Sequence, residues 1–117
     1  MEPVKGGHLV KLPQEAKDIL AALGGGSDAS YAIRFAASFP GIFMVLSGMG
    51  SVEMVADNCG YMQNFQPLNE KELEAVEQVK NILLSQARVD CTGCRYCMPC
   101  PKNVDIPGPF AAYNRRY

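Results

Sequence analysis

Two segments in the N-terminal third of the chain carry apolar residues at helical spacing. Pro13 suits the first turn of a helix, and the apolar residues within 16–23 follow on one face. Residues 24–26 are all glycine and are expected to end that helix. Ser27 can cap a second helix that runs to Phe39, where Pro-Gly stops it. The second helix is apolar on more than one face, so we expect it to be buried between two layers.

Residues 42–46 form an uninterrupted apolar run. Its length and composition predict a buried parallel strand. A glycine-containing turn over residues 47–51 then leads into a predicted helix from Val52 to about Gly60. A strand, a turn and a helix N-terminus can together hold an anion. The signal is weak, because the stretch has no G-x-G-x-x-G pattern and no Walker lysine.

The best-specified helix is predicted to start after Asn69. Asn69 is a favourable N-cap, and Glu72 stands three residues later as in a capping box. The following apolar residues form one predicted buried stripe: Leu73, Val76, Val79, Leu83 and Ala87. A last, short helix is expected to begin at Phe110.

Four of the five cysteines lie within ten residues, in the pattern C-x2-C-x2-C-x2-C-P: Cys91, Cys94, Cys97 and Cys100. Soft thiolate ligands at two-residue gaps, followed by proline, indicate an iron–sulfur loop. In one ligation scheme all four cysteines bind a single [4Fe–4S] cluster, and this is the scheme we favour. In the other, three bind and Cys59 or another chain completes the site.

Structural zinc is the rival interpretation of the four cysteines. Zinc sites usually pair two C-x2-C units across a longer loop, so overlapping gaps suit a cluster better. Cys59 lies among apolar residues near the end of a predicted helix. Outside the second ligation scheme, we expect it to be a small buried hydrophobe.

Charge is distributed unevenly along the 117 residues. The net charge of −1 argues against a general nucleic-acid binder. Up to residue 87 there are 6 basic and 10 acidic residues, and from Arg88 onward 5 basic and 2 acidic ones. A cluster held by four thiolates is anionic, so a basic surrounding would stabilise it, although a solvated basic tail explains the same charges.

Neither a signal peptide nor a membrane-spanning stretch is visible in the sequence. The N-terminus is polar and interrupted by glycine, and the longest apolar run is far too short to cross a bilayer. We therefore expect a cytoplasmic protein without membrane partners. In that reducing compartment, dense cysteines indicate metal binding rather than disulfides.

Most of the chain resembles a known enzyme family. Residues 1–7, 30–40, 45–58 and 67–70 resemble the last two βα units of an aldo/keto reductase (β/α)8 barrel. Residues 91–107 look like the C-terminal ferredoxin-type extension of the iron–sulfur-bearing branch of that family. The cysteine run is the most specific part of this resemblance.

The resemblance implies a fold, a cofactor and partners. The fold would be mainly α with one short strand: a helical C-terminal barrel fragment over residues 1–88, followed by an iron–sulfur tail over residues 89–117. The parent protein would use a nicotinamide dinucleotide on carbonyl substrates. The family's catalytic residues lie on early strands that would precede Met1, so no catalytic residue is expected in this chain. Its partner would be the missing N-terminal half of the barrel or a redox partner protein.

The nucleotide-binding positions of the family fall on Gly48, Asp57 and Asn58. Asp57 and Asn58 match the acidic–Asn pair near the adenine. Gly48 stands where the family has a phosphate-binding Lys, and Met54 stands where it has an Arg. Because both cations are replaced, a preference for the 2′-phosphate of NADP does not follow.

Together these features predict the iron–sulfur-binding, electron-transfer portion of an aldo/keto reductase-like oxidoreductase. Two alternatives stay open. In the first, zinc or a structural cluster only stabilises the loop, and the chain is an interaction module. The chain could also be an inert fragment that docks on the missing half of the barrel.

Overall fold

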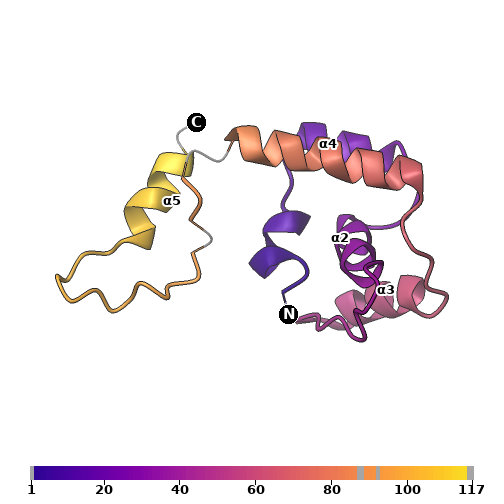
Figure 1. The fold of residues 1–117 in the computed structure, drawn as a ribbon, viewed down its shortest axis with the longest axis horizontal. Helices are drawn as coiled ribbons and strands as arrows, with labels where there is room; N and C mark the ends of the chain where they lie inside the picture. The colour runs from indigo at the N-terminus through magenta and orange to yellow at the C-terminus, as the bar shows by residue number, and fades with distance from the viewer. Residues whose placement is uncertain (1, 87–88, 92, 116–117) are drawn as a thin grey trace. The chain divides into compact units, whose positions relative to one another are not determined.

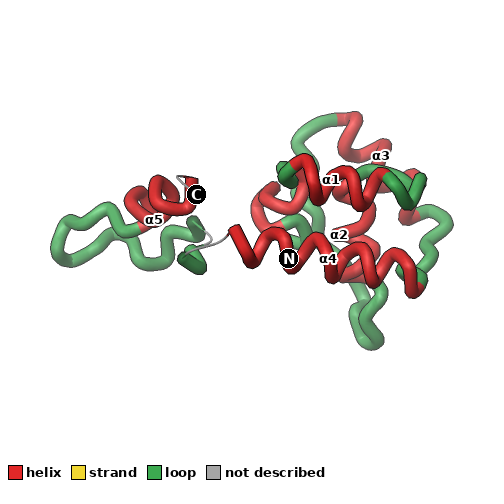
Figure 2. Tube along the Cα trace, turned by 90° about the horizontal axis from the view of Figure 1, so that it is seen from above, coloured by secondary structure: helices red, strands yellow, loops and turns green. Residues whose placement is uncertain are grey.

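The computed structural model describes residues 2–86, 89–91 and 93–115, and that part of the chain is helical without any strand (Figures 1 and 2). It contains a 3₁₀ helix and five α-helices: η1 (Lys5–Val10), α1 (Gln14–Ala21), α2 (Asp28–Ala37), α3 (Val52–Met62), α4 (Glu70–Gln86) and α5 (Pro107–Arg115). The chain divides into two compact units, Met1–Val79 and Lys80–Tyr117, which are described separately below.

Helix α2 lies at the centre of the first unit. It contacts both η1 and α3, as Figure 1 shows for α3. The core of the unit is small and consists of apolar side chains from several segments: Leu12, Ala16, Leu20, Tyr31, Ile33, Leu68, Ala75 and Val79. Tyr31 is almost wholly buried, and its hydroxyl donates to the carbonyl of Leu20 at 3.4 Å. This contact joins α2 to the end of α1.

Side-chain caps fix where three of the helices begin. The Ser27 hydroxyl accepts from the Ser30 N–H at the start of α2, and the Ser51 hydroxyl accepts from the Met54 N–H at the start of α3. At α4 the Asn69 side chain accepts from the Glu72 N–H at 3.0 Å, and the Glu72 carboxylate accepts from the Asn69 N–H at 2.9 Å. This reciprocal pair confirms the predicted capping box.

An ion pair joins α2 to α4. The guanidinium of Arg34 donates two bonds to the carboxylate of Glu72, at 2.8 and 3.0 Å. Its Nε donates a third bond to the carbonyl of Gln66 at 3.0 Å. Only 13% and 12% of the two side chains is exposed, so the pair is largely withdrawn from water. The Glu72 carboxylate therefore serves both the α4 cap and the contact between the two helices.

The predicted fold class is wrong. Residues 42–50 have no regular secondary structure, and the all-helical described chain is not a fragment of a (β/α)8 barrel. The physical reason is that a strand exists only when its backbone pairs with a neighbouring strand. The described chain offers no second strand to residues 42–46. Four of the five side chains are accordingly exposed, Phe43 to 93%, and Val45 is only partly buried.

The buried face of α4 also differs from the predicted stripe. Leu73 is exposed, whereas Glu72, Ala75 and Val79 are buried. The register is shifted because Arg34 draws Glu72 toward α2, and the residues three and seven positions later share its face. Ala87, the last residue of the predicted stripe, lies outside the described residues.

The second unit holds the cysteine run and the C-terminal helix. Helix α5 begins at Pro107, three residues before the expected start at Phe110, and Pro at the first helical position is favourable. Arg88 and Arg116, which contribute to the predicted basic charge, lie outside the described residues.

Across the described chain, no helix combines the length and apolar character needed to cross a bilayer.

Loss of the α4 cap is expected to weaken the first unit. Asn69→Ala removes the acceptor for the Glu72 N–H, and we expect the free energy of unfolding to fall by about 1 kcal/mol. Urea denaturation followed by circular dichroism measures this change. Asn64→Ala, in an exposed turn, is the matched control. Equal stability of the two variants would contradict the role assigned to the cap.

Candidate functional site

The four clustered cysteines lie in the loop between α4 and α5. Cys94 and Cys97 are exposed, whereas Cys91 and Cys100 are partly buried. All are present as thiols. A short, solvent-accessible loop with four thiols is chemically suited to soft metals, because the thiolate is the ligand form and metal binding displaces its proton.

Tight turns shape the backbone of this loop. The N–H of Met98 donates to the carbonyl of Arg95 at 2.8 Å, and the N–H of Asn103 donates to the carbonyl of Cys100 at 2.9 Å. Gly93 and Arg95 have positive φ angles of 68° and 61°. A positive φ is uncommon for a residue other than glycine, and at Arg95 it marks a sharp bend of the backbone. A turn between two cysteines brings them closer in space than an extended chain would.

A two-bond clamp closes the loop at its base. The side chain of Asn114 in α5 accepts from the Val89 N–H at 3.0 Å and donates to the Val89 carbonyl at 2.9 Å. Val89 stands two residues before the first cysteine of the run, and its carbonyl also accepts from the Cys91 N–H at 2.8 Å. The clamp therefore fixes the start of the cysteine loop to the helix that follows it.

The thiols are not gathered into one group in this structure. Within the described residues, no three or more His, Cys, Asp or Glu side chains are arranged so that they could hold a metal ion. The donor set itself fits a cluster, because it supplies four soft ligands from one short loop. Binding would have to draw the four sulfur atoms together from their present positions.

Cys59, the fifth cysteine, belongs to the other unit. It lies in α3 and is exposed, so the expectation of a small buried hydrophobe is wrong. Helix α3 has no fully buried residue, although Asn58, Tyr61 and Met62 are partly covered. Whether Cys59 completes a cluster held by three other cysteines stays a prediction.

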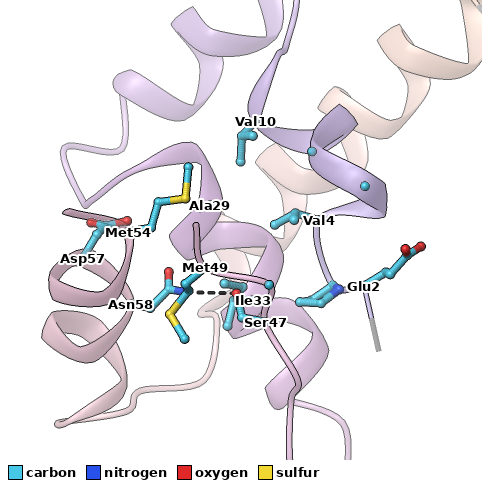
Figure 3. Close-up of a pocket in the computed structure, with 14 residues that line it drawn as sticks. Glu2, Val4, Val10, Ala29, Ile33, Ser47, Met49, Met54, Asp57 and Asn58 are labelled. Atoms are coloured by element: carbon cyan, nitrogen blue, oxygen red, sulfur yellow. Dashed lines mark hydrogen bonds between the residues drawn. The ribbon is translucent and has the colours of Figure 1, made fainter. Parts of the chain in front are cut away.

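A pocket in the first unit brings together the three predicted nucleotide-binding residues. Gly48, Asp57 and Asn58 all line a cavity of about 440 Å³ between η1, α2, α3 and residues 47–49 (Figure 3). Thus residues separated by ten positions in the sequence meet at one site.

Both polar members of this trio are engaged with other side chains. The Asp57 carboxylate accepts from the Ser27 hydroxyl at 2.5 Å, and the Asn58 amide donates to the Ser47 hydroxyl at 3.0 Å, the dashed line in Figure 3. The Asn58 carbonyl oxygen accepts from the Tyr61 hydroxyl. Burial, together with the negative charge of Asp57, raises the pKa of Tyr61 to about 12, so this hydroxyl keeps its proton. These bonds tie α3 to α2 and to the loop before it.

The pocket does not offer what a dinucleotide needs. A pyrophosphate is held by cationic side chains or by unsatisfied amides at a helix N-terminus. The described lining residues include Glu2 and Asp57 but neither Lys nor Arg. The residues present therefore do not fit a nicotinamide dinucleotide, and the function proposed below does not include one.

Two contacts of these sites were not predicted from the sequence. Ser27 was expected only to cap α2, yet it also binds Asp57 thirty positions away. Asn114 was expected only within a short helix, yet it clamps Val89 twenty-five positions away. No local sequence motif indicates the contact of Ser27 with Asp57 or that of Asn114 with Val89. These contacts are therefore visible only in the structure.

Comparison with known proteins leaves the chain without a match. No protein-family model, no curated protein and no solved structure matches it. The resemblance of residues 91–107 to the iron–sulfur branch of the aldo/keto reductases stays a prediction. Function is therefore argued from the cysteine loop and the pocket themselves.

Opening the clamp is expected to loosen the cysteine loop. Asn114→Ala removes both bonds to Val89, so we expect the Val89 amide to exchange its hydrogen faster, by about tenfold for one lost bond. Hydrogen exchange followed by NMR measures this directly. Asn81→Ala on the exposed face of α4 is the matched control. An unchanged exchange rate in the Asn114 variant would show that the clamp does not hold the loop.

Proposed function

We propose that Cys91, Cys94, Cys97 and Cys100 bind a single [4Fe–4S] cluster and that the chain is the electron-transfer portion of an oxidoreductase. The observation that carries this proposal is the spacing of four thiols at two-residue gaps in one accessible loop. The resemblance of the loop to the tail of iron–sulfur aldo/keto reductases supports the same assignment. The reducing cytoplasm, where we place the protein, keeps such thiols available.

The loop supplies more than its sulfur ligands. Backbone N–H groups in the turns around Gly93 and Arg95 are candidates to donate hydrogen bonds to sulfur, which raises the reduction potential. Arg95 and Lys102 are exposed and place positive charge on either side of the last two cysteines. Positive charge close by stabilises an anionic centre. When bound, the cluster supplies one-electron chemistry, accepting a single electron from a reduced donor and passing it to an oxidised acceptor.

The implied partner is a redox protein that delivers or takes this electron. Cys94 and Cys97 lie at the exposed part of the loop, where a second protein can approach the sulfur ligands. Tyr96, between them, is 95% exposed, and exposed aromatic side chains are favoured at protein interfaces. Electron transfer to such a partner needs no catalytic residue from this chain.

Anaerobic reconstitution with ferrous iron and sulfide tests the proposal. We expect a brown protein with about four iron and four sulfide per chain, the composition of one cubane cluster. One-electron reduction with dithionite is expected to give an EPR signal from one unpaired electron per chain. A colourless protein that takes up no iron would overturn the proposal. Stoichiometric zinc without iron uptake would instead identify a structural staple.

A further inference from the structure

The pocket of the first unit has the dimensions of a ligand site. Its volume is about 440 Å³, within the range of roughly 300–1,000 Å³ that is usual for small-molecule pockets. It lies within one compact unit and does not involve the cysteine loop. The pocket and the cysteine loop therefore belong to different units.

Most of the wall is apolar. Side chains from the N-terminal segment, η1, α2, α3 and the segment before α3 surround the space in Figure 3: Val4, Val10, Ala29, Ile33, Met49 and Met54. Methionine is flexible and polarisable, and its sulfur makes favourable contacts with aromatic rings. The wall is thus suited to an apolar or aromatic body rather than to a sugar.

The charges at the pocket have one sign. Asp57 and Glu2 lie on opposite sides of it, and the Glu2 carboxylate is directed away from the other labelled residues (Figure 3). No Lys or Arg is present among the described residues that line it. The Ser27 hydroxyl contacts one oxygen of Asp57, and a carboxylate has about four acceptor sites on its two oxygens. Asp57 can therefore accept a further bond from a cationic ligand.

At the N-terminus of α3, the helix end nearest the pocket, side chains of the protein itself already bind the backbone N–H groups. The Ser51 hydroxyl accepts from the Met54 N–H at 3.3 Å. Hydrogen bonds from its own backbone N–H and from the Ser51 side chain lower the pKa of Glu53, so a carboxylate occupies the first turn of α3. An anionic ligand arriving there would meet negative charge instead of open amides.

We infer that this pocket binds a small cationic amphiphile, an ammonium group on an aromatic or aliphatic body, and discriminates against the matching anion and against pyrophosphates. The apolar body lies against Ile33, Met49 and Met54, and the ammonium group faces Asp57. This specificity is opposite in charge to that of a dinucleotide site.

Tryptamine and indole-3-propionate test the inference, because both carry an indole ring and they differ in the charge of the side chain. Calorimetric titration of the full chain should give tighter binding of tryptamine, by at least about tenfold for one charged hydrogen bond. With methionine methyl groups labelled with ¹³C, the Met49 and Met54 signals should shift while the Met44 and Met98 signals serve as internal references.

Two variants make the outcome decisive. Asp57→Asn keeps an acceptor for Ser27 but removes the charge, so it should abolish the preference for tryptamine, whereas Asp18→Asn on α1 should leave it unchanged. Met54→Lys, at an exposed position, should favour indole-3-propionate instead. Equal binding of the two probes, no binding of tryptamine, or shifts confined to methyl groups outside the pocket would overturn the inference.

Discussion

Cys97→Ser is expected to remove nearly all iron from the reconstituted protein. A single cubane cluster uses four thiolate ligands, and a serine hydroxyl is a hard, weakly acidic ligand that binds iron poorly. The variant should lose the visible absorption of the cluster and its EPR signal after reduction. Iron and sulfide analysis after gel filtration measures the loss. Cys97 is exposed in the loop, so the substitution itself should leave the helices intact.

Cys59→Ser is the matched control and also separates the two ligation schemes. Cys59 is exposed like Cys97 but lies in α3 of the first unit. If one loop holds the cluster alone, this variant keeps its full iron content. Iron lost from the Cys59 variant but retained when one of the four loop cysteines is replaced would establish the scheme with three loop cysteines. Any three of the four include Cys97 or Cys100, so full iron retention in both Cys97→Ser and Cys100→Ser would contradict cluster binding by the loop.

Arg34→Ala is expected to destabilise the first unit by about 3 kcal/mol, near the lower end of the range for breaking a buried ion pair. The substitution removes three hydrogen bonds and leaves the Glu72 carboxylate buried without its counter-charge. Arg34→Lys should recover only part of this, because an ammonium group cannot reproduce the planar two-bond contact. Urea denaturation of the variants measures the difference, and equal stability of Arg34→Ala and wild type would contradict it.

The same ion pair makes stability depend on pH. The hydrogen bonds from Arg34, followed by the backbone contact at Asn69, lower the pKa of Glu72 below its ordinary value of 4.5. A lowered pKa in the folded state adds stability that is present above the ordinary value and is lost as pH falls through the folded-state pKa. Wild type should therefore lose more stability than Glu72→Gln between pH 6 and pH 3. Parallel pH profiles of the two proteins would contradict this assignment.

The helices were predictable because their signals are local. Ser27 and Asn69 precede runs of helix-forming residues. As predicted, Ser27 caps α2 and Asn69 caps α4. The glycines after α1 and the Pro-Gly after α2 end those helices near the expected positions. Caps and breakers act through backbone groups within three or four residues, so the sequence alone is enough to identify them.

The errors arose where structure depends on distant residues. The apolar run 42–46 satisfies the length and composition of a strand, but pairing requires a second strand that the described chain does not contain. The stripe on α4 was misplaced because Arg34, thirty-eight positions earlier, binds Glu72 and sets which face of α4 is buried. Hydrophobic periodicity gives no information on such a pairing.

The candidate sites divide in the same way. The spacing of the four cysteines is visible in the sequence, whereas the clamp between Val89 and Asn114 appears only in the fold. The grouping of Gly48 with Asp57 and Asn58 was expected from a resemblance, and the structure places them at one pocket. Glu2 also lines that pocket, fifty-five positions before Asp57 in the sequence, and no local pattern predicts its place there.

The exposed apolar run has a consequence for handling the protein. Residues 42–46 lack regular secondary structure, are uncharged and free of proline, and are rich in β-forming side chains. This is the composition of segments that nucleate cross-β aggregates. Pro40 and Gly41 on one side and Gly48 and Gly50 on the other limit its length. Such flanking residues act as gatekeepers, because they interrupt the growth of a paired sheet beyond the run. At high protein concentration, we expect fibrils to form through this segment.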